Sequence, residues 1–328
     1  MARHRERPPV RLGAWGRHTC GDSLIRSTLK RRVEQVLASD AVARLTRRRV
    51  RGRALILAYH AVVPRNEGRR HAGEQALFVT QSKFAEHLDA VAEAADVVPI
   101  AGLEGDGSGR PRIAITFDDA YQGAVTGAVD ELVARGLPAT IFVAPGRLDG
   151  HVFWWDALAG ESGILDTRIR DYALDALCGE DERIRSWASG AGLKATDDLP
   201  RHARSASQAE LRAAAQRPGI SIGSHSWSHT NLARLDATQL TIELQRPLAW
   251  IREQFGTRAI PGLAYPYGLE SSMVRSAAAF AGYSRALRIS GGWFRPDEVS
   301  PLAWPRLNIP SGLSANGLRA RLAGAIRA

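Results

Sequence analysis

Two observations predict an α/β fold for this chain. From Ala54 onward, short apolar runs alternate with stretches of helical periodicity, and polar residues follow several of these runs directly. Of the 328 residues, 45% are hydrophobic and 24% are charged, which is ordinary for a globular protein that buries a sizeable core. Strands joined by helices favour a parallel sheet with its active site at the carboxyl ends of the strands.

The expected strands are short apolar runs bounded by turn residues, at 54–59, 97–100, 113–117, 139–143, 220–223, 263–265 and 304–309. Helices are expected at 82–94, 121–134, 236–255 and 271–281. Ser82 is the expected N-cap of the first helix, with Glu86 near its first turn. Gly136 and Pro138 are expected to end the second. The stretch 146–217 lacks a strand pattern and predicts a helical insertion between two strands.

The sequence divides into a basic, partly helical extension (1–53), a main domain (54–310) and a C-terminal helix (311–328). Residues 1–53 hold 15 Lys and Arg against 4 Asp and Glu, whereas the rest of the chain is nearly neutral. Apolar residues at helical spacing between Ile25 and Leu37 are typical of an interfacial helix at an anionic membrane surface. An ordinary helix docked on the main domain would show the same pattern. Nucleic acid is not an expected partner, because no aromatic-basic interleaving or binding motif occurs.

The protein is expected to be cytoplasmic. The basic extension also suggests a peripheral contact with the inner face of the membrane. No apolar run approaches the ~20 residues that span a bilayer, and no apolar core follows the N-terminal arginines. Cys20 and Cys178 are too few for a disulfide framework or a zinc knuckle.

Paired carboxylates follow the strand expected at 113–117. Asp118 and Asp119 come directly after it, and successive residues leaving a strand point to opposite sides. One carboxylate can therefore bind a cation while the other accepts a proton. Alternatively, Asp119 caps the helix that follows.

Two histidines follow the strand expected at 220–223. His225 and His229 are four residues apart and share one face if the segment forms a helical turn. One carboxylate with two imidazoles leaves positions open on a metal for water and substrate, as catalytic sites do.

A rigid turn, Tyr265-Pro266-Tyr267-Gly268, follows the strand expected at 263–265. Besides simply reversing the chain, it can aim a backbone N–H, that of Tyr267, at a developing oxyanion.

Together the Thr116–Ala120, Ser224–His229 and Ala264–Gly268 motifs resemble the polysaccharide deacetylases with a NodB-homology domain, carbohydrate esterase family 4. The resemblance covers roughly residues 54–310 and implies a distorted (β/α)7 barrel. It also implies that Asp119, His225 and His229 hold a divalent metal. Zinc is the family's default, although Ni²⁺, Co²⁺ and Fe²⁺ suit the same ligands.

The resemblance further implies that Asp118 is the general base for the metal-bound water, and that the Tyr267 N–H and the metal stabilise the oxyanion. Many members place the general acid in a late Leu-x-His motif, but no histidine follows His229 here. His60, after Tyr59 at the end of the first strand, resembles the acid of the branch that deacetylates exopolysaccharides; a partly buried histidine closing the barrel floor is the alternative.

Ala264 stands where many members have the arginine that holds the base, and Arg306 is a candidate substitute. Adjacent Trp154 and Trp155 cannot both face one core, so at least one is expected to be exposed or to line a groove. Alternatively, the pair anchors the insertion to the barrel. The candidate substrate contacts are Trp155, Trp227, Tyr265 and Pro266.

The expected function is metal-dependent removal of acetyl groups from N-acetylated sugars of a polysaccharide or glycan precursor. Two alternatives stay open. The same site suits O-acetyl ester hydrolysis, and a barrel that only binds carbohydrate would keep the fold. Intact Asp118, Asp119, His225 and His229 argue against the second.

Overall fold

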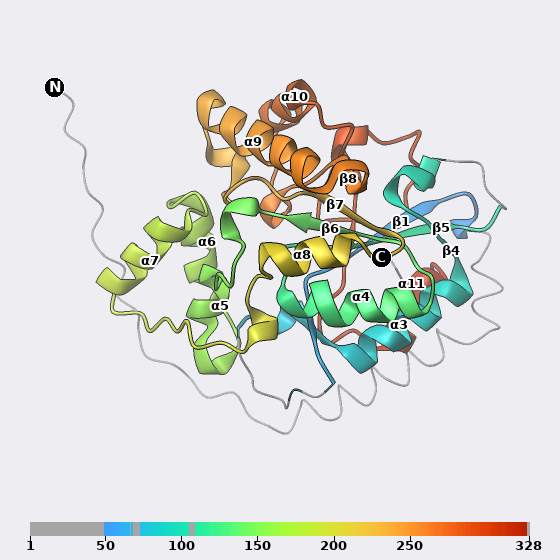
Figure 1. Cartoon of the computed structure of the whole chain (residues 1–328), viewed down its shortest axis with the longest axis horizontal. Coiled ribbons are helices and arrows are strands. Elements are labelled where there is room, and N and C mark those ends of the chain that lie inside the picture. The colour runs from blue at the N-terminus through green and yellow to red at the C-terminus, as the bar shows by residue number, and fades with distance from the viewer. Residues whose placement is uncertain (1–48, 66, 68–72, 105–108, 327–328) are drawn as a thin grey trace.

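A curled parallel sheet forms the centre of the structure, a computed structural model that describes residues 49–65, 67, 73–104 and 109–326 (Figure 1). Its main path runs β10-β1-β5-β6-β7-β8-β9, and all pairs are parallel. The strands are β1 (Ala54–Tyr59), β5 (Arg112–Phe117), β6 (Ala139–Val143), β7 (Ile220–Ser224), β8 (Ala259–Ala264), β9 (Arg285–Leu287) and β10 (Leu307–Asn308). This agrees with the expected α/β class and with a distorted barrel.

Two features refine the sheet. The short β4 (Asp96–Val97) pairs with the first residues of β5, whereas β6 pairs with the last residues of β5. A parallel bridge joins Leu287 of β9 to Trp304, on the segment that leads to β10 at the other edge. The sheet therefore curls toward closure. A separate two-stranded sheet pairs β2 (Ala61–Val63) with β3 (Phe78–Thr80).

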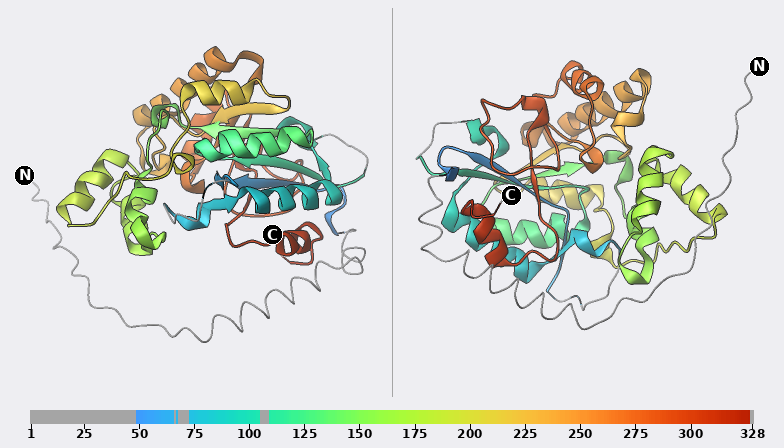
Figure 2. Two further views of the ribbon diagram at one scale, coloured as in Figure 1. Left: turned by 60° about the horizontal axis from the view of Figure 1, so that its bottom comes forward. Right: turned by 180° about the vertical axis from the view of Figure 1, so that it is seen from behind.

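The central strands are largely apolar because both faces of the sheet are covered. In β1, Leu55 and Leu57 belong to one buried cluster, and Ile56 belongs to another on the opposite face. The covering helices are α3 (Gln81–Ala94), α4 (Val129–Ala134), α8 (Gln208–Ala215), α9 (Ala237–Phe255) and α10 (Ser272–Ala281), while α11 (Ala315–Leu322) packs on α3 (Figure 2).

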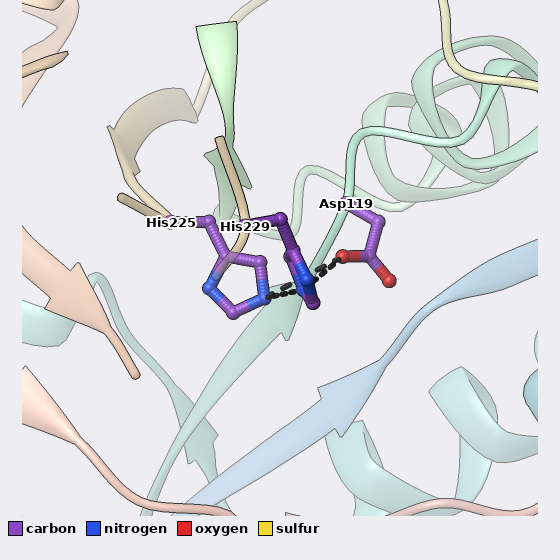
Figure 3. Close-up of side chains that lie close together, drawn as sticks. All are labelled: Asp119, His225 and His229. Atoms are coloured by element: carbon purple, nitrogen blue, oxygen red, sulfur yellow. Dashed lines mark hydrogen bonds and ion pairs between the residues drawn. The ribbon is translucent and has the colours of Figure 1, made fainter. Parts of the chain in front are cut away.

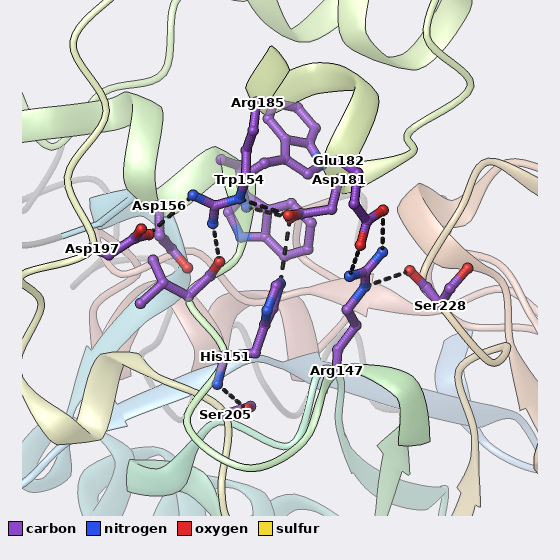
Figure 4. Close-up of polar contacts among 12 residues, drawn as sticks. Arg147, His151, Trp154, Asp156, Asp181, Glu182, Arg185, Asp197, Ser205 and Ser228 are labelled. Carbon is purple, nitrogen blue, oxygen red and sulfur yellow. Dashed lines mark hydrogen bonds and ion pairs between the residues drawn. The ribbon is translucent and has the colours of Figure 1, made fainter. Parts of the chain in front are cut away.

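The segment between β6 and β7 is helical, and the part of the chain that the structure describes there contains no strand. Beside α8 it forms α5 (Trp154–Ala159), α6 (Thr167–Asp175) and α7 (Asp181–Gly190), which lie together at one side of the sheet (Figures 1 and 2). A hydrogen bond joins α5 to α7, because the Trp154 N–H donates to Asp181 Oδ1 at 3.2 Å, and Arg185 of α7 holds Asp181 through an ion pair at 2.6 Å (Figure 4).

The structure corrects several expected boundaries. Helix α3 is capped by Thr80, whose Oγ1 accepts the Lys83 N–H, so Ser82 lies inside the helix. The helix expected at 121–134 begins as a π-helical turn at Ala124 and continues as α4. Of the last expected strand, only Leu307–Asn308 forms a strand, and Trp304 makes an isolated bridge to β9. The segment expected at 97–100 pairs only through Asp96–Val97.

No helix of the described residues is long and apolar enough to cross a membrane. Residues 1–48, which make up most of the basic extension with its expected amphipathic helix, lie outside the described residues. The expected C-terminal helix is present as α11, although it is shorter than 311–328.

Candidate active site

The functional motifs meet because parallel strands present their carboxyl ends at one edge of the sheet. Tyr59 of β1 pairs with Phe117 of β5, and Val143 of β6 pairs with Ser224 of β7. The residues that follow these strands are therefore neighbours across the edge. They line a cavity of about 350 Å³ whose walls include His60, Asp118, Asp119, His225, His229 and Tyr267.

Asp119, His225 and His229 converge on one point (Figure 3). Asp119 Oδ1 lies 3.0 Å from His229 Nε2 and 3.5 Å from His225 Nε2, and the two Nε2 atoms are 3.1 Å apart. His225 Nδ1 donates to the Ala264 carbonyl oxygen at 2.7 Å. Because that nitrogen carries the proton, Nε2 of His225 presents a lone pair to the convergence point.

The charge states of these three residues fit a cation site. Burial lowers the pKa of His225, and it lowers the pKa of His229 to about 4, so both imidazoles are neutral near pH 7. Burial raises the pKa of Asp119, whose Oδ1 has no hydrogen-bond partner in the described residues. A buried carboxylate without a donor is costly. A divalent cation at the convergence point would remove that cost, so the donor set fits a metal.

Asp118 lines the same cavity, beside these ligands, and is held by Arg306. The guanidinium donates from Nη1 to Oδ1 and from Nη2 to Oδ2, each at 2.7 Å, and Nη1 also contacts Thr116 Oγ1 at 3.2 Å. Arg306 is completely buried. Burial alone would raise the pKa of Asp118, but the charge of Arg306 and its hydrogen bonds outweigh that effect and hold the pKa well below its usual range. This is the contact that a residue orienting the base would make.

His60 lines the same cavity at the end of β1, and its Nδ1 has no partner among the described residues. Burial lowers the pKa of its imidazole, while the carboxylates of Asp118 and Asp119 act in the opposite direction. His60 is therefore placed to exchange a proton with a group bound in the cavity.

The backbone is strained where the motifs lie. Seven non-glycine residues of the described chain have a positive φ, and five of them are Asp119, Ala120, Ser226, His229 and Tyr267. Such conformations cost free energy and are typical of functional sites. The His225–His229 segment is accordingly a loop and not the expected helical turn, although the two Nε2 atoms still meet.

The Tyr267 turn adopts a left-handed conformation with φ 59°. Its Gly268 and Leu269 N–H groups donate to the carbonyls of Tyr265 and Pro266, whereas the Tyr267 N–H donates to no backbone carbonyl of the described residues. That N–H is thus left for another acceptor. The Tyr267 hydroxyl accepts the Trp154 indole N–H at 3.0 Å.

The expected substrate contacts separate into two groups. Trp155 lines the cavity, and its ring lies 4.8 Å from that of His229. Trp227, Tyr265 and Pro266 are not among the described residues lining the cavity. Tyr265 is buried and donates its hydroxyl to the Leu302 carbonyl, and Trp227 lies under Arg246 with the guanidinium 3.6 Å from its ring centre. Trp154 and Trp155 are both largely buried in the core cluster, and both line the cavity.

Sequence reasoning missed several residues that build the cavity. Glu74, Leu77, Arg170, Ile289 and Asn308 also line it. None of them belongs to a spaced motif, and they come from segments far apart in the chain. Glu243 of α9 was missed as well; it accepts the N–H groups of Trp227 and Ser228, each at 2.9 Å, and so holds the histidine loop.

The chain was compared with protein-family models, with curated proteins and with solved structures. A family model described as polysaccharide deacetylase matches residues 105–286. No curated protein matches the chain.

Solved structures share its fold at low sequence identity. The Streptococcus pyogenes deacetylase PplD in complex with acetate has 17% identity and a TM-score of 0.57, covering 82% of this chain and 98% of that one. IcaB from Ammonifex degensii has 16% identity and a TM-score of 0.57, with 83% and 97% covered. A de-N-acetylase from Aggregatibacter actinomycetemcomitans has 16% identity and a TM-score of 0.54, with 81% and 98% covered.

Proposed function

Because this chain belongs to the polysaccharide deacetylase family, and is thus a hydrolase acting on acetylated carbohydrate, we propose that it cleaves the amide of N-acetylated sugars in a polysaccharide or glycan precursor. The observation that supports this most directly is the pairing of two carboxylates with different environments in one cavity. Asp118 is fixed by Arg306, whereas Asp119 converges with two imidazoles. Metal-assisted hydrolysis of an amide uses a base that accepts a proton from water and a Lewis acid that polarises the carbonyl.

Asp119, His225 and His229 would hold a divalent cation, and zinc is the proposed ion. Such a cation supplies Lewis-acid polarisation and acidifies a water molecule. The chain's own contribution is to fix the ligands. The Ala264 carbonyl sets the tautomer of His225. The Ser226 hydroxyl accepts the backbone N–H of His229 at 3.0 Å.

Asp118 is the proposed general base. Arg306 keeps its carboxylate ionised and turned into the cavity, where Oδ2 lies 4.0 Å from His225 Nε2. A proton removed from the attacking water would therefore be accepted at a carboxylate oxygen beside the metal ligands. The Tyr267 N–H is the proposed donor to the oxyanion that forms on the acetyl carbonyl.

His60 is the proposed general acid. The lowered pKa means that its imidazole is neutral at rest near pH 7, so it must gain a proton before it can protonate the leaving amine. The neighbouring carboxylates favour that protonated form. The position of His60 at the end of β1, facing the cavity, also supports our proposal that the chain belongs to the branch acting on exopolysaccharides.

The test is acetate release from N-acetylglucosamine oligomers after metal stripping and readdition of single divalent ions. We expect zinc to restore release in the wild type and Asp118→Asn to reduce it by at least about 100-fold. Asp130→Asn, an exposed carboxylate on α4, is the matched control. Release that survives Asp118→Asn would contradict the assignment of the base.

O-acetylated sugars provide a second arm of the same assay. An alkoxide leaves with less help from an acid than an amine does, so His60→Ala should impair amide cleavage far more than ester cleavage. If His60→Ala reduced amide and ester cleavage equally, His60 would not be the group that protonates the leaving amine. Ester cleavage alone in the wild type would identify an O-acetyl esterase.

We also propose a cytoplasmic location with peripheral contact between residues 1–53 and an anionic membrane, on the charge pattern of that segment alone. Removing residues 1–48, which spares the buried Val50, should weaken binding to anionic vesicles and leave turnover of a soluble oligomer unchanged. Unchanged vesicle binding would exclude the membrane contact.

A further inference from the structure

The cavity has a second wall, formed by residues outside the deacetylase motifs. Glu74 and Leu77 come from the segment before β3, Trp155 from α5, Leu165 from the loop before α6, and Arg170 from α6 itself. Because the reacting groups come from the strand ends, this wall is available to the part of a substrate that lies beyond the acetyl group.

Partly buried hydrogen bonds hold the wall in place. The Glu74 N–H donates to Asp156 Oδ1 at 2.8 Å, and Glu74 Oε2 accepts the Leu165 N–H at 2.6 Å. The Gln75 N–H donates to the Gly163 carbonyl at 2.9 Å. Asp156 is completely buried. Hydrogen bonds from Glu74 and Gln75 thus join the loop before β3 to the loop before α6. These bonds fix the position at which α6 begins.

Asp156 also connects this wall to the reaction centre. Its Oδ2 accepts the Tyr121 hydroxyl at 2.5 Å, and that hydroxyl accepts the Trp155 indole N–H at 2.9 Å. Trp155 in turn lies against the His229 ring. The second wall is therefore pre-organised relative to the metal ligands, as a specificity surface needs to be.

Arg170 is the one arginine or lysine among the described residues lining the cavity. Of the acidic groups in the lining, Asp118 binds Arg306, Glu74 accepts two backbone N–H groups, and Asp119 belongs to the candidate metal site. The exposed guanidinium of Arg170 has no hydrogen-bond or ion-pair partner among the residues that the structure describes. It is a free cation on a fixed helix at the cavity.

We infer that the substrate carries an anionic group, a carboxylate or a phosphate, close to the acetylated sugar, and that Arg170 binds it. The planar guanidinium matches both oxyanions through paired N–H donors. Arg170 would then determine specificity without taking part in proton transfer. The inference rests on the proposed function of the site and names the class of carbohydrate that it takes.

Arg168 provides a matched control. It lies two residues earlier on α6, is also exposed, and is not among the residues lining the cavity. A general effect of removing positive charge from α6 would appear in both variants, whereas recognition of a bound anion would appear only in Arg170→Gln.

The experiment compares three N-acetylglucosamine trisaccharides: a neutral one, one with a terminal glucuronate and one with a terminal phosphate. We expect the wild type to show a KM about three- to tenfold lower for at least one anionic substrate, with similar kcat. Arg170→Gln should remove that preference, Arg170→Lys should keep part of it, and Arg168→Gln should keep all of it. The preference should weaken with added salt.

Absence of an anion preference in the wild type, or a preference that survives Arg170→Gln, would overturn the inference. Equilibrium binding of the same three sugars to Asp118→Asn separates it from the proposed function. Anion-selective binding that depends on Arg170, without turnover of any sugar by the wild type, would support the inference and contradict amide hydrolysis. Turnover without anion selectivity would support amide hydrolysis and contradict the inference about Arg170. The carboxylate and phosphate arms identify the source of the charge.

Discussion

Arg306 shows how strongly a single residue can control this site. It is completely buried, and both of its terminal nitrogens are bound to Asp118. The desolvation of both ions opposes their attraction, so the pair does not guarantee a large net stabilisation. Removing one partner is different, because the other charge is then buried alone.

Arg306→Gln should lower the free energy of unfolding by about 3–5 kcal/mol, measured by urea denaturation. The pKa of Asp118 should rise, because burial raises it once the arginine is gone. A base acts only above its pKa, so activity should be lost at a higher pH as pH falls. The test is the acid limb of the pH–rate profile.

Arg217→Gln, which breaks an exposed pair with Asp130, is the control and should cost under about 1 kcal/mol. An unmoved acid limb in a folded Arg306→Gln protein would mean that Asp118 does not limit the rate at low pH.

At the scale of elements, helix α9 supports the loop that carries the metal-type ligands. Glu243 is almost completely buried, and it binds the Trp227 and Ser228 N–H groups and the Ser228 hydroxyl. On the other side of the same loop, Arg147 Nε donates to the Ser228 carbonyl at 3.0 Å (Figure 4). The loop is therefore fixed between α9 and the segment after β6.

Glu243→Gln keeps one accepting oxygen but replaces the other with an NH2 group, so the side chain no longer accepts at both positions. We expect zinc affinity to fall about tenfold, because supporting contacts of this kind orient the ligands. Competition with a chromogenic chelator measures it. Glu253→Gln, an exposed change on the same helix, should leave the affinity unchanged. Equal affinities in both variants would show that the loop keeps its shape without Glu243.

For the molecule as a whole, the cation would link two strands of the sheet. Asp119 follows β5, and His225 and His229 follow β7, with β6 between them. A ligand that binds only the folded state stabilises it by an amount that grows with its concentration, about 2.7 kcal/mol at 100 times its Kd.

Zinc should therefore raise the Tm of the stripped protein by several degrees, and Asp119→Asn should abolish the rise. Since burial raises the pKa of Asp119, protons should compete with zinc at a higher pH than for an ordinary carboxylate, and the rise should shrink as pH falls. Asp130→Asn is the control. A full rise in Tm with Asp119→Asn would place the zinc elsewhere.

The local sequence determined the elements with strong signals. The runs at β1 and β6 were predicted to the residue, because a strand buried on both faces is largely apolar and stands out from the turns beside it. Asp236 and Ser271 cap α9 and α10 where the patterns placed the helix starts. The three-residue strands β2, β3 and β9 went unpredicted, because three residues carry too little periodicity.

At the site, the sequence by itself identified the reactive side chains. Carboxylates and imidazoles that directly follow apolar strands are recognisable from the local sequence, because both the residue types and their positions are local features. Only the tertiary structure decided how these side chains meet. A strained loop turns His225 toward His229, and Arg306 binds Asp118, which lies 188 residues earlier in the sequence. The second wall of the cavity presents Arg170. These contacts join residues distant in sequence. Their geometry depends on sheet order and loop conformation, neither of which leaves a local pattern in the chain.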